Sequence, residues 1–132
     1  MVPLDGSKNS LRGFQFAVGI AVQSESSIVG LHVTSIPIDI EILPNVRKKI
    51  IKKSEEIIKK AELIAKKNNV SFTGIIKENN NVGNTIVAFA KKNKTDLIII
   101  GSHGPDPEIE MFFGSVAYYV LNKSKIPVAV VK

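Results

Sequence analysis

Apolar and polar residues follow two patterns that alternate along the chain in a regular order. Short runs rich in isoleucine, valine and leucine indicate buried strands at residues 1–4, 27–35, 70–77, 95–100 and 126–131. Between these runs, apolar residues recur every three or four positions, which predicts helices at residues 10–22, 44–69, 82–94 and 114–122. The pattern therefore predicts five strands with a helix between each consecutive pair.

This alternation determines the expected fold class. Strands that are joined through helices run parallel, with right-handed crossovers. We expect an α/β fold with an open five-stranded parallel sheet, in the order 3-2-1-4-5, and helices on both faces, a Rossmann-like arrangement. The 132 residues suit one domain, residues 1–132. Residues 36–44 break the pattern. They could form an extra strand, a lid, a contact with a partner chain or a loop held by its apolar side, and the loop is favoured.

The formal charge of +6 suggests a nucleic-acid partner at first. The distribution of this charge argues against one, because lysines of the segment 44–69 follow glutamates by four residues, as Lys59 follows Glu55. That order favours ion pairs on a hydrated helix face, and no aromatic side chain stands among the lysines to stack on bases. We therefore expect a solvated surface and no nucleic-acid binding. The opposite side of this helix is expected to pack inward through Val46, Ile50, Ile57, Ala61 and Ile64.

Composition excludes several kinds of site. The chain has no cysteine, which excludes a disulfide, a thiol nucleophile and a thiolate metal site. The first residues lack the basic and apolar segments of a signal peptide. The apolar run at residues 97–100 is far too short to span a bilayer. We expect a cytoplasmic protein without a membrane partner.

In open sheets of this class, ligands bind beyond the carboxyl ends of the strands, where the strand order reverses. Residues 5–7, residues 33–35 and the residues from 101 onward reach that edge. The expected architecture therefore gives the place of a site but does not identify its ligand.

The segment from residue 101 to residue 115 carries the most chemical information. It leaves a buried strand through Gly101 and Gly104 and enters a helix at Gly114 and Ser115. Glycine lets the backbone approach a ligand closely, and the start of a helix offers N–H groups and a positive dipole end to a phosphate. The same residues could instead turn the chain and cap the helix, so spacing alone leaves both interpretations open. Neither the Gly-Lys-Ser/Thr phosphate loop nor the dinucleotide glycine pattern occurs.

The spacing of these four residues resembles the nucleotide-binding motif of the universal stress protein family. Similar blocks stand in the family's order at residues 2–7, 31–33, 96–101, 114–117 and 127–131, so the resemblance covers essentially the whole chain. It implies a small regulatory protein that binds an adenine nucleotide, ATP or AMP. Asp5 and its neighbouring backbone would contact the nucleotide, and Val33 would lie beside the adenine. The residues expected to form the site are Pro3, Leu4, Asp5, Val33, Gly101, His103, Gly104, Gly114, Ser115 and Val116.

One departure from the family affects the choice of nucleotide. Family members often carry a basic residue soon after the second glycine, whereas this chain has three carboxylates within residues 105–110. Carboxylates repel a triphosphate unless a cation such as Mg²⁺ intervenes. AMP or another nucleotide that carries less charge than ATP is therefore favoured.

The two histidines do not indicate catalysis or a metal site. His103 could act as a general base, but no nucleophile and acid in the sequence complete a triad with it. His32 is expected to be a satisfied, partly buried histidine, and the two residues do not have a recognisable metal-ligand spacing. We expect no catalytic residue and at most slow ATP hydrolysis.

The last strand predicts a partner. In the expected order, residues 126–131 form an apolar edge, and antiparallel pairing of two such edges would make a two-fold homodimer. The family resemblance implies the same arrangement. An alternative function remains open, because the acidic residues favour a dimeric interaction protein of this fold that binds an unknown protein and no nucleotide.

Overall fold

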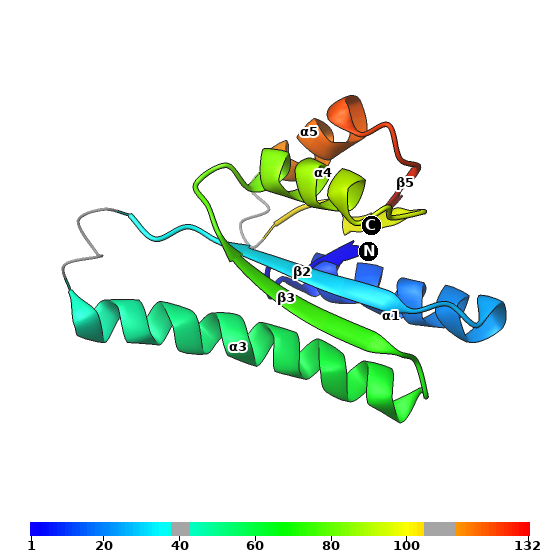
Figure 1. Cartoon of the computed structure of the whole chain (residues 1–132), viewed down its shortest axis with the longest axis horizontal. Coiled ribbons are helices and arrows are strands. Elements are labelled where there is room, and N and C mark those ends of the chain that lie inside the picture. Colours follow the sequence, from blue (N-terminus) through cyan, green and yellow to red (C-terminus); the bar gives the residue numbers. More distant parts are fainter. Residues whose placement is uncertain (38–42, 105–112) are drawn as a thin grey trace.

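The computed structural model describes residues 1–37, 43–104 and 113–132 and contains every strand and helix that the pattern predicts (Figure 1). The strands are β1 (Val2–Pro3), β2 (Ile28–Thr34), β3 (Phe72–Glu78), β4 (Ile98–Gly101) and β5 (Val128–Val131). The helices are α1 (Lys8–Ser24), α3 (Pro44–Lys67), α4 (Val82–Lys92) and α5 (Ser115–Lys123). Most of the irregular segment 36–44 and the acidic residues 105–110 lie outside the described residues.

The strands are parallel, and their order agrees with the predicted α/β fold. One sheet has the order β1-β2-β3, and a second sheet pairs β4 with β5. β2 and β3 pair over their full length, with Ile28 opposite Phe72 and Thr34 opposite Glu78. A backbone hydrogen bond joins the chain at β1 to β4. The order 3-2-1-4-5 is therefore present, with an interruption between β1 and β4 that the sequence analysis did not foresee.

Pro3 explains this interruption. The N–H of Ile99 donates to the C=O of Met1 at 3.0 Å. In a parallel ladder the next hydrogen bond runs back to Ile99 from the residue two positions after Met1, and that residue is Pro3, which has no N–H. The Met1 ammonium donates to the C=O of Leu97 at 2.8 Å; burial lowers the pKa of this ammonium, and the carboxylate of Asp96 opposes the shift. Few backbone hydrogen bonds therefore join the two sheets.

Helices cover both faces of the strands and enclose two hydrophobic clusters. In Figure 1, α4 and α5 lie on one side of the strands, and α1 and α3 lie on the other. The cluster on the α1 side includes Phe14, whose ring packs edge-on against Phe72 of β3 at a centroid distance of 5.5 Å. The buried residues of the other cluster are Leu31, Ile86, Ala90, Ile98, Ile100, Ala117 and Val120. This second cluster reaches the carboxyl ends of β2 and β4, so it also borders the place where a ligand is expected.

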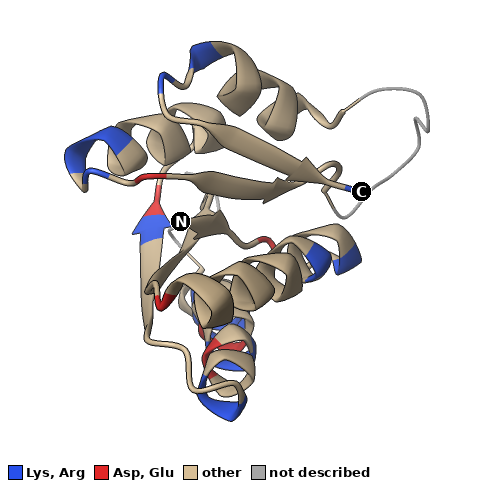
Figure 2. Ribbon diagram, turned by 90° about the vertical axis from the view of Figure 1, so that its right-hand side faces the viewer, with Lys and Arg blue, Asp and Glu red and all other residues tan. Residues whose placement is uncertain are grey.

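α3 carries half of the chain's 18 lysines and arginines, and Figure 2 shows basic and acidic residues together on this helix. Its fully buried residues are Ser54, Ala61 and Ala65. The predicted inward stripe is wrong at its first position, because Val46 is 37% exposed. In Figure 1 the first turns of α3 extend past the ends of β2 and β3, so no strand lies there for an apolar side chain to pack against. Within the described residues, none of the helices combines the length and apolarity that a membrane crossing needs.

Candidate functional site

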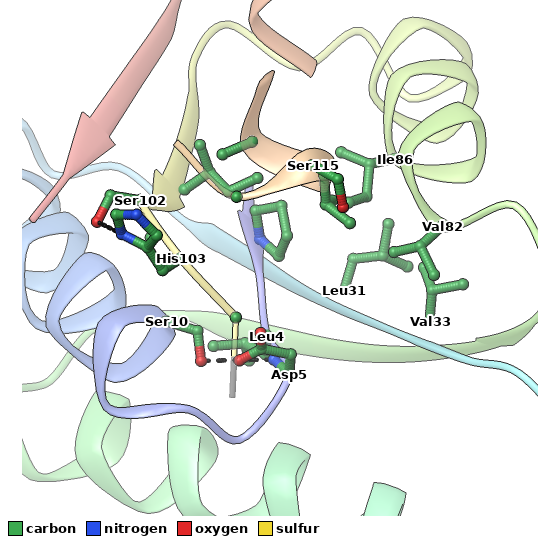
Figure 3. A pocket seen from close by; sticks show the side chains of 17 residues that line it. Leu4, Asp5, Ser10, Leu31, Val33, Val82, Ile86, Ser102, His103 and Ser115 are labelled. Atoms are coloured by element: carbon green, nitrogen blue, oxygen red, sulfur yellow. Dashed lines mark hydrogen bonds between the residues drawn. The ribbon is translucent and has the colours of Figure 1, made fainter. Parts of the chain in front are cut away.

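A cavity of about 380 Å³, here called the site pocket, opens at the carboxyl ends of β1, β2 and β4 (Figure 3). The ten residues nominated from the sequence all line it: Pro3, Leu4, Asp5, Val33, Gly101, His103, Gly104, Gly114, Ser115 and Val116. They come from three segments that are far apart in the sequence. The fold brings these segments together as the topology of a parallel sheet predicts.

The floor of the site pocket is apolar. Leu31, Ile86 and Ile100 line it and are 1%, 1% and 5% exposed, and Val82 and Ala117 stand beside them. The sequence analysis did not include these residues in the site, because an apolar residue of a strand or helix is expected to be core whether or not a cavity borders it. A floor of this kind suits a flat apolar surface such as a nucleobase face.

The end of β2 offers a peptide group to the site pocket. The C=O of Leu31 accepts a hydrogen bond from the N–H of Leu4 at 2.8 Å, so this part of β2 faces β1. In a strand, the N–H and the C=O of one residue point to the same side, and successive residues alternate between the two sides. The C=O of Thr34 accordingly faces β3, where it accepts from the N–H of Asn79 at 2.9 Å. The N–H and C=O of Val33 therefore face the β1 side, past the end of β1, and present one donor and one acceptor side by side.

Asp5 forms the turn that leads from β1 to α1. Its Oδ1 accepts from the N–H of Ser7 at 2.8 Å, and Gly6 between them has φ +83°, a conformation that favours glycine. The N–H of Asp5 approaches Oγ of Ser10 at 3.4 Å, and a Cβ on Gly104 would lie 3.4 Å from Oδ2 of Asp5. Among the described residues that line the site pocket, Asp5 is the single carboxylate, and none is a lysine or arginine.

In the connection from β4 to α5, one backbone amide of the motif is already hydrogen-bonded within the chain. The N–H of Gly114 donates to the C=O of Ser102 at 2.7 Å, and the N–H of Ser102 donates to the C=O of Val131 at 2.8 Å. The amide of Gly114 is therefore engaged within the chain and acts as part of the turn. α5 begins at Ser115, and the N–H groups of its first turn have no acceptor within the helix. These amides and the exposed hydroxyl of Ser115 are therefore the groups at this end of the site pocket that could face an anion.

Ser102 is a site residue that the sequence analysis did not single out. Its side chain is 2% exposed, and its Oγ lies 2.9 Å from Nδ1 of His103. The signal that could have found it is its position between Gly101 and His103 in the motif. Within the parts of the chain that the structure describes, no three His, Asp or Glu residues form a group that could hold a metal ion.

His32 lies below the site pocket, on the α3 side of β2, and is 8% exposed. Its Nδ1 lies 2.7 Å from the C=O of Leu4, and its Nε2 lies 3.1 Å from Oγ of Ser54 on α3. Oγ of Ser54 also lies 3.0 Å from the C=O of Ile50, so its single proton serves either that carbonyl or Nε2. Both ring nitrogens have partners, as expected for a satisfied buried histidine.

Comparison with known proteins supports one family over the whole chain. The model of the universal stress protein family matches residues 1–132. Universal stress protein MJ0531 of Methanocaldococcus jannaschii is 28% identical over 144 residues, which cover 100% of this chain and 80% of that protein. Universal stress protein YxiE of Bacillus subtilis is also 28% identical over 144 residues, which cover 100% of this chain and 97% of that protein.

Solved structures show the same fold. UspA from Lactobacillus plantarum matches with a TM-score of 0.84 and 20% identity, over 99% of this chain and 94% of that one. A universal stress protein family protein from Arabidopsis thaliana with AMP bound has a TM-score of 0.74 and 21% identity, over 100% of this chain and 89% of that one. The Archaeoglobus fulgidus protein in complex with dAMP has a TM-score of 0.71 and 23% identity, covering 97% and 91%. At these identities the likeness concerns the fold.

Proposed function

Because the chain belongs to the universal stress protein family, we propose that it is a regulatory protein that binds an adenine nucleotide in the site pocket. One observation carries the proposal: segments from three strand ends enclose a single cavity with an apolar floor and a polar rim. Solved relatives that hold AMP and dAMP support the same ligand class.

The proposed position of the base follows from the shape and chemistry of the site pocket. The adenine lies on the apolar floor, with one edge against the peptide of Val33. There its amino group donates to the C=O and its ring nitrogen accepts from the N–H, since adenine presents a donor and an acceptor side by side. The phosphate extends to the start of α5, where amides of the first turn and the hydroxyl of Ser115 face an anion favourably.

The charges around the site pocket predict a preference for AMP over ATP. Asp5 supplies a negative charge, and none of the described lining residues is a lysine or an arginine that would balance a triphosphate. We expect AMP to bind at micromolar concentration and ATP to bind at least about fivefold more weakly without Mg²⁺, because each added phosphate brings further uncompensated charge. Mg²⁺ should reduce that difference. Isothermal titration calorimetry with AMP, ATP and ATP with Mg²⁺ measures all three affinities.

The same titration separates the proposal from the alternative function. If neither nucleotide gives a heat of binding at millimolar concentration, and denatured purified protein releases no nucleotide in mass spectrometry, nucleotide binding is refuted. The chain would then be an interaction protein of this fold, which the carboxylate and the lack of a described cation in the pocket lining favour.

We also propose that two copies form a homodimer through the free edge of β5. The C=O groups of Pro127 and Val131 face β4 and accept hydrogen bonds from Ile98 and Ser102. Because successive residues of a strand alternate, the N–H and C=O of Val130 face outward. The two helices that contact β5 carry exposed aromatic side chains: Phe16 of α1 is 51% exposed and Tyr118 of α5 is 62% exposed. Such a patch beside an unpaired edge strand fits a partner.

A proline at position 130 tests this interface. Val130→Pro removes an outward N–H and should leave the ladder with β4 in place, because proline is tolerated at an edge whose N–H faces solvent. We expect light scattering at micromolar concentration to give twice the chain mass for the wild type and the chain mass for the variant. Val128→Ala, which keeps its N–H, is the control and should stay dimeric. A monomeric wild type would contradict the proposed dimer.

A further inference from the structure

The hydrogen-bond ladder between β1 and β2 stops one step earlier than the neighbouring backbone would allow. Its last bond runs from the N–H of Leu4 to the C=O of Leu31 at 2.8 Å. In a parallel ladder, the next bond would run from the N–H of Val33 to the C=O of Leu4. That bond does not occur among the hydrogen bonds of the described residues, and the C=O of Leu4 instead meets Nδ1 of His32 at 2.7 Å.

His32 is held firmly where it meets this carbonyl. A carbonyl oxygen only accepts hydrogen bonds, so Nδ1 of His32 carries a proton and donates to Leu4. On the far side of the ring, Nε2 carries no proton and accepts from the hydroxyl of Ser54 on α3 at 3.1 Å, and the C=O of Ile50, 3.0 Å from the same Oγ, is the alternative acceptor for that proton. The imidazole is 8% exposed and therefore joins the end of β1 to α3 through the interior.

We propose that His32 is a positioning residue for the ligand's base: it holds the carbonyl of Leu4 away from β2 and so leaves the peptide of Val33 to the nucleotide. Without this contact, the carbonyl of Leu4 is the natural acceptor for the N–H of Val33. The donor that faces the ring nitrogen of adenine would then be consumed within the sheet. This inference rests on the proposed function for the identity of the ligand, but its statement about the free protein does not.

The first test therefore uses the wild-type protein without ligand. Amide hydrogen exchange by NMR compares Val33 with Leu31, whose peptide faces the same side of β2 but lies inside the ladder. We expect the amide of Val33 to exchange faster than that of Leu31 and to become protected when AMP is added. Two-bond ¹H–¹⁵N spectra should show the proton of His32 on Nδ1. A Val33 amide already protected without ligand would overturn the inference.

The second test uses two side chains of the same shape. His32→Asn keeps an N–H donor near the position of Nδ1, whereas His32→Leu has a similar outline and no donor. We expect His32→Leu to lower the ratio of AMP to GMP affinity by about tenfold, the effect of losing one well-placed hydrogen bond in a buried site. His32→Asn should keep that ratio within about twofold of the wild type.

A purely structural role predicts a different result. If His32 only fills the core, both variants lower the melting temperature and leave the ratio of AMP to GMP affinity unchanged, and that outcome refutes the positioning role. If His32→Leu does not fold, the hydrogen exchange of the Val33 amide in the wild type without ligand decides the role of His32. If the wild type binds neither nucleotide, the proposed function fails, and the exchange of Val33 without ligand still decides the role of His32.

Discussion

Replacing Gly104 with leucine should abolish nucleotide binding and leave the folded protein intact. Among the described residues, a Cβ at this position meets Oδ2 of Asp5 alone, at 3.4 Å, which is an ordinary contact, and the backbone of Gly104 does not have the positive φ that demands glycine. The longer side chain therefore extends into the site pocket, which Gly104 lines. We expect the affinity for AMP to fall by at least about 100-fold, or about 2.7 kcal/mol, because ligand and leucine compete for one volume.

Calorimetric titration of AMP measures this loss, and thermal unfolding shows that the fold is unchanged. Gly104→Ala is the matched control, since its added methyl group fits the space and should change the affinity by less than about threefold. A leucine variant that binds AMP as well as the wild type would place the ligand outside the site pocket.

Replacing Gly101 with alanine should have the largest effect on stability. A Cβ on Gly101 would lie 2.6 Å from the carbonyl carbon of Asn9 and 2.8 Å from the backbone nitrogen of Ser10, at the start of α1. These are main-chain atoms of a helix, which cannot turn aside as a side chain can. We expect the free energy of unfolding to fall by about 3 kcal/mol, the upper end for added volume in a packed interior.

Urea denaturation measures this change, and Gly19→Ala in the middle of α1 is the control. No other described residue places an atom within 4 Å of a Cβ at Gly19, apart from the backbone of α1 itself, so alanine there should raise the free energy of unfolding by about 0.5–1 kcal/mol through its higher helix propensity. The two substitutions add the same methyl group and should have opposite signs. Equal urea midpoints for Gly101→Ala and the wild type would show that α1 and β4 do not approach each other as closely as described.

The sequence predicted the elements, their order and the edge that carries the site because each depends on a local or periodic signal. Alternating apolar runs predict strands and helices, and the topology of a parallel sheet then brings residues such as Asp5, Val33 and Gly101 to one edge. The family resemblance added the ligand class. No arrangement of apolar residues could show that Leu31 and Ile86 border a cavity, because a pocket floor and a packed core require the same residue types.

The details that the sequence did not reveal depend on contacts between distant segments. The engagement of the Gly114 amide depends on the path of the chain past Ser102, and the exposure of Val46 depends on where the strands beneath α3 end. The partners of His32 lie just after β1 and on α3, 28 and 22 positions away in the sequence. A single sequence shows that a histidine stands at the end of an apolar strand but not which carbonyl its ring meets.

Pro3 affects how the two sheets are connected. Since it lacks the N–H that would complete the ladder to Ile99, β1 and β4 lie side by side without being paired as one sheet. Residues from both sides of this boundary line the site pocket: Val33 comes from the β1-β2-β3 sheet, and Ser115 comes from the connection between β4 and β5. A ligand that contacted both residues would connect the two sheets at the place where the backbone does not.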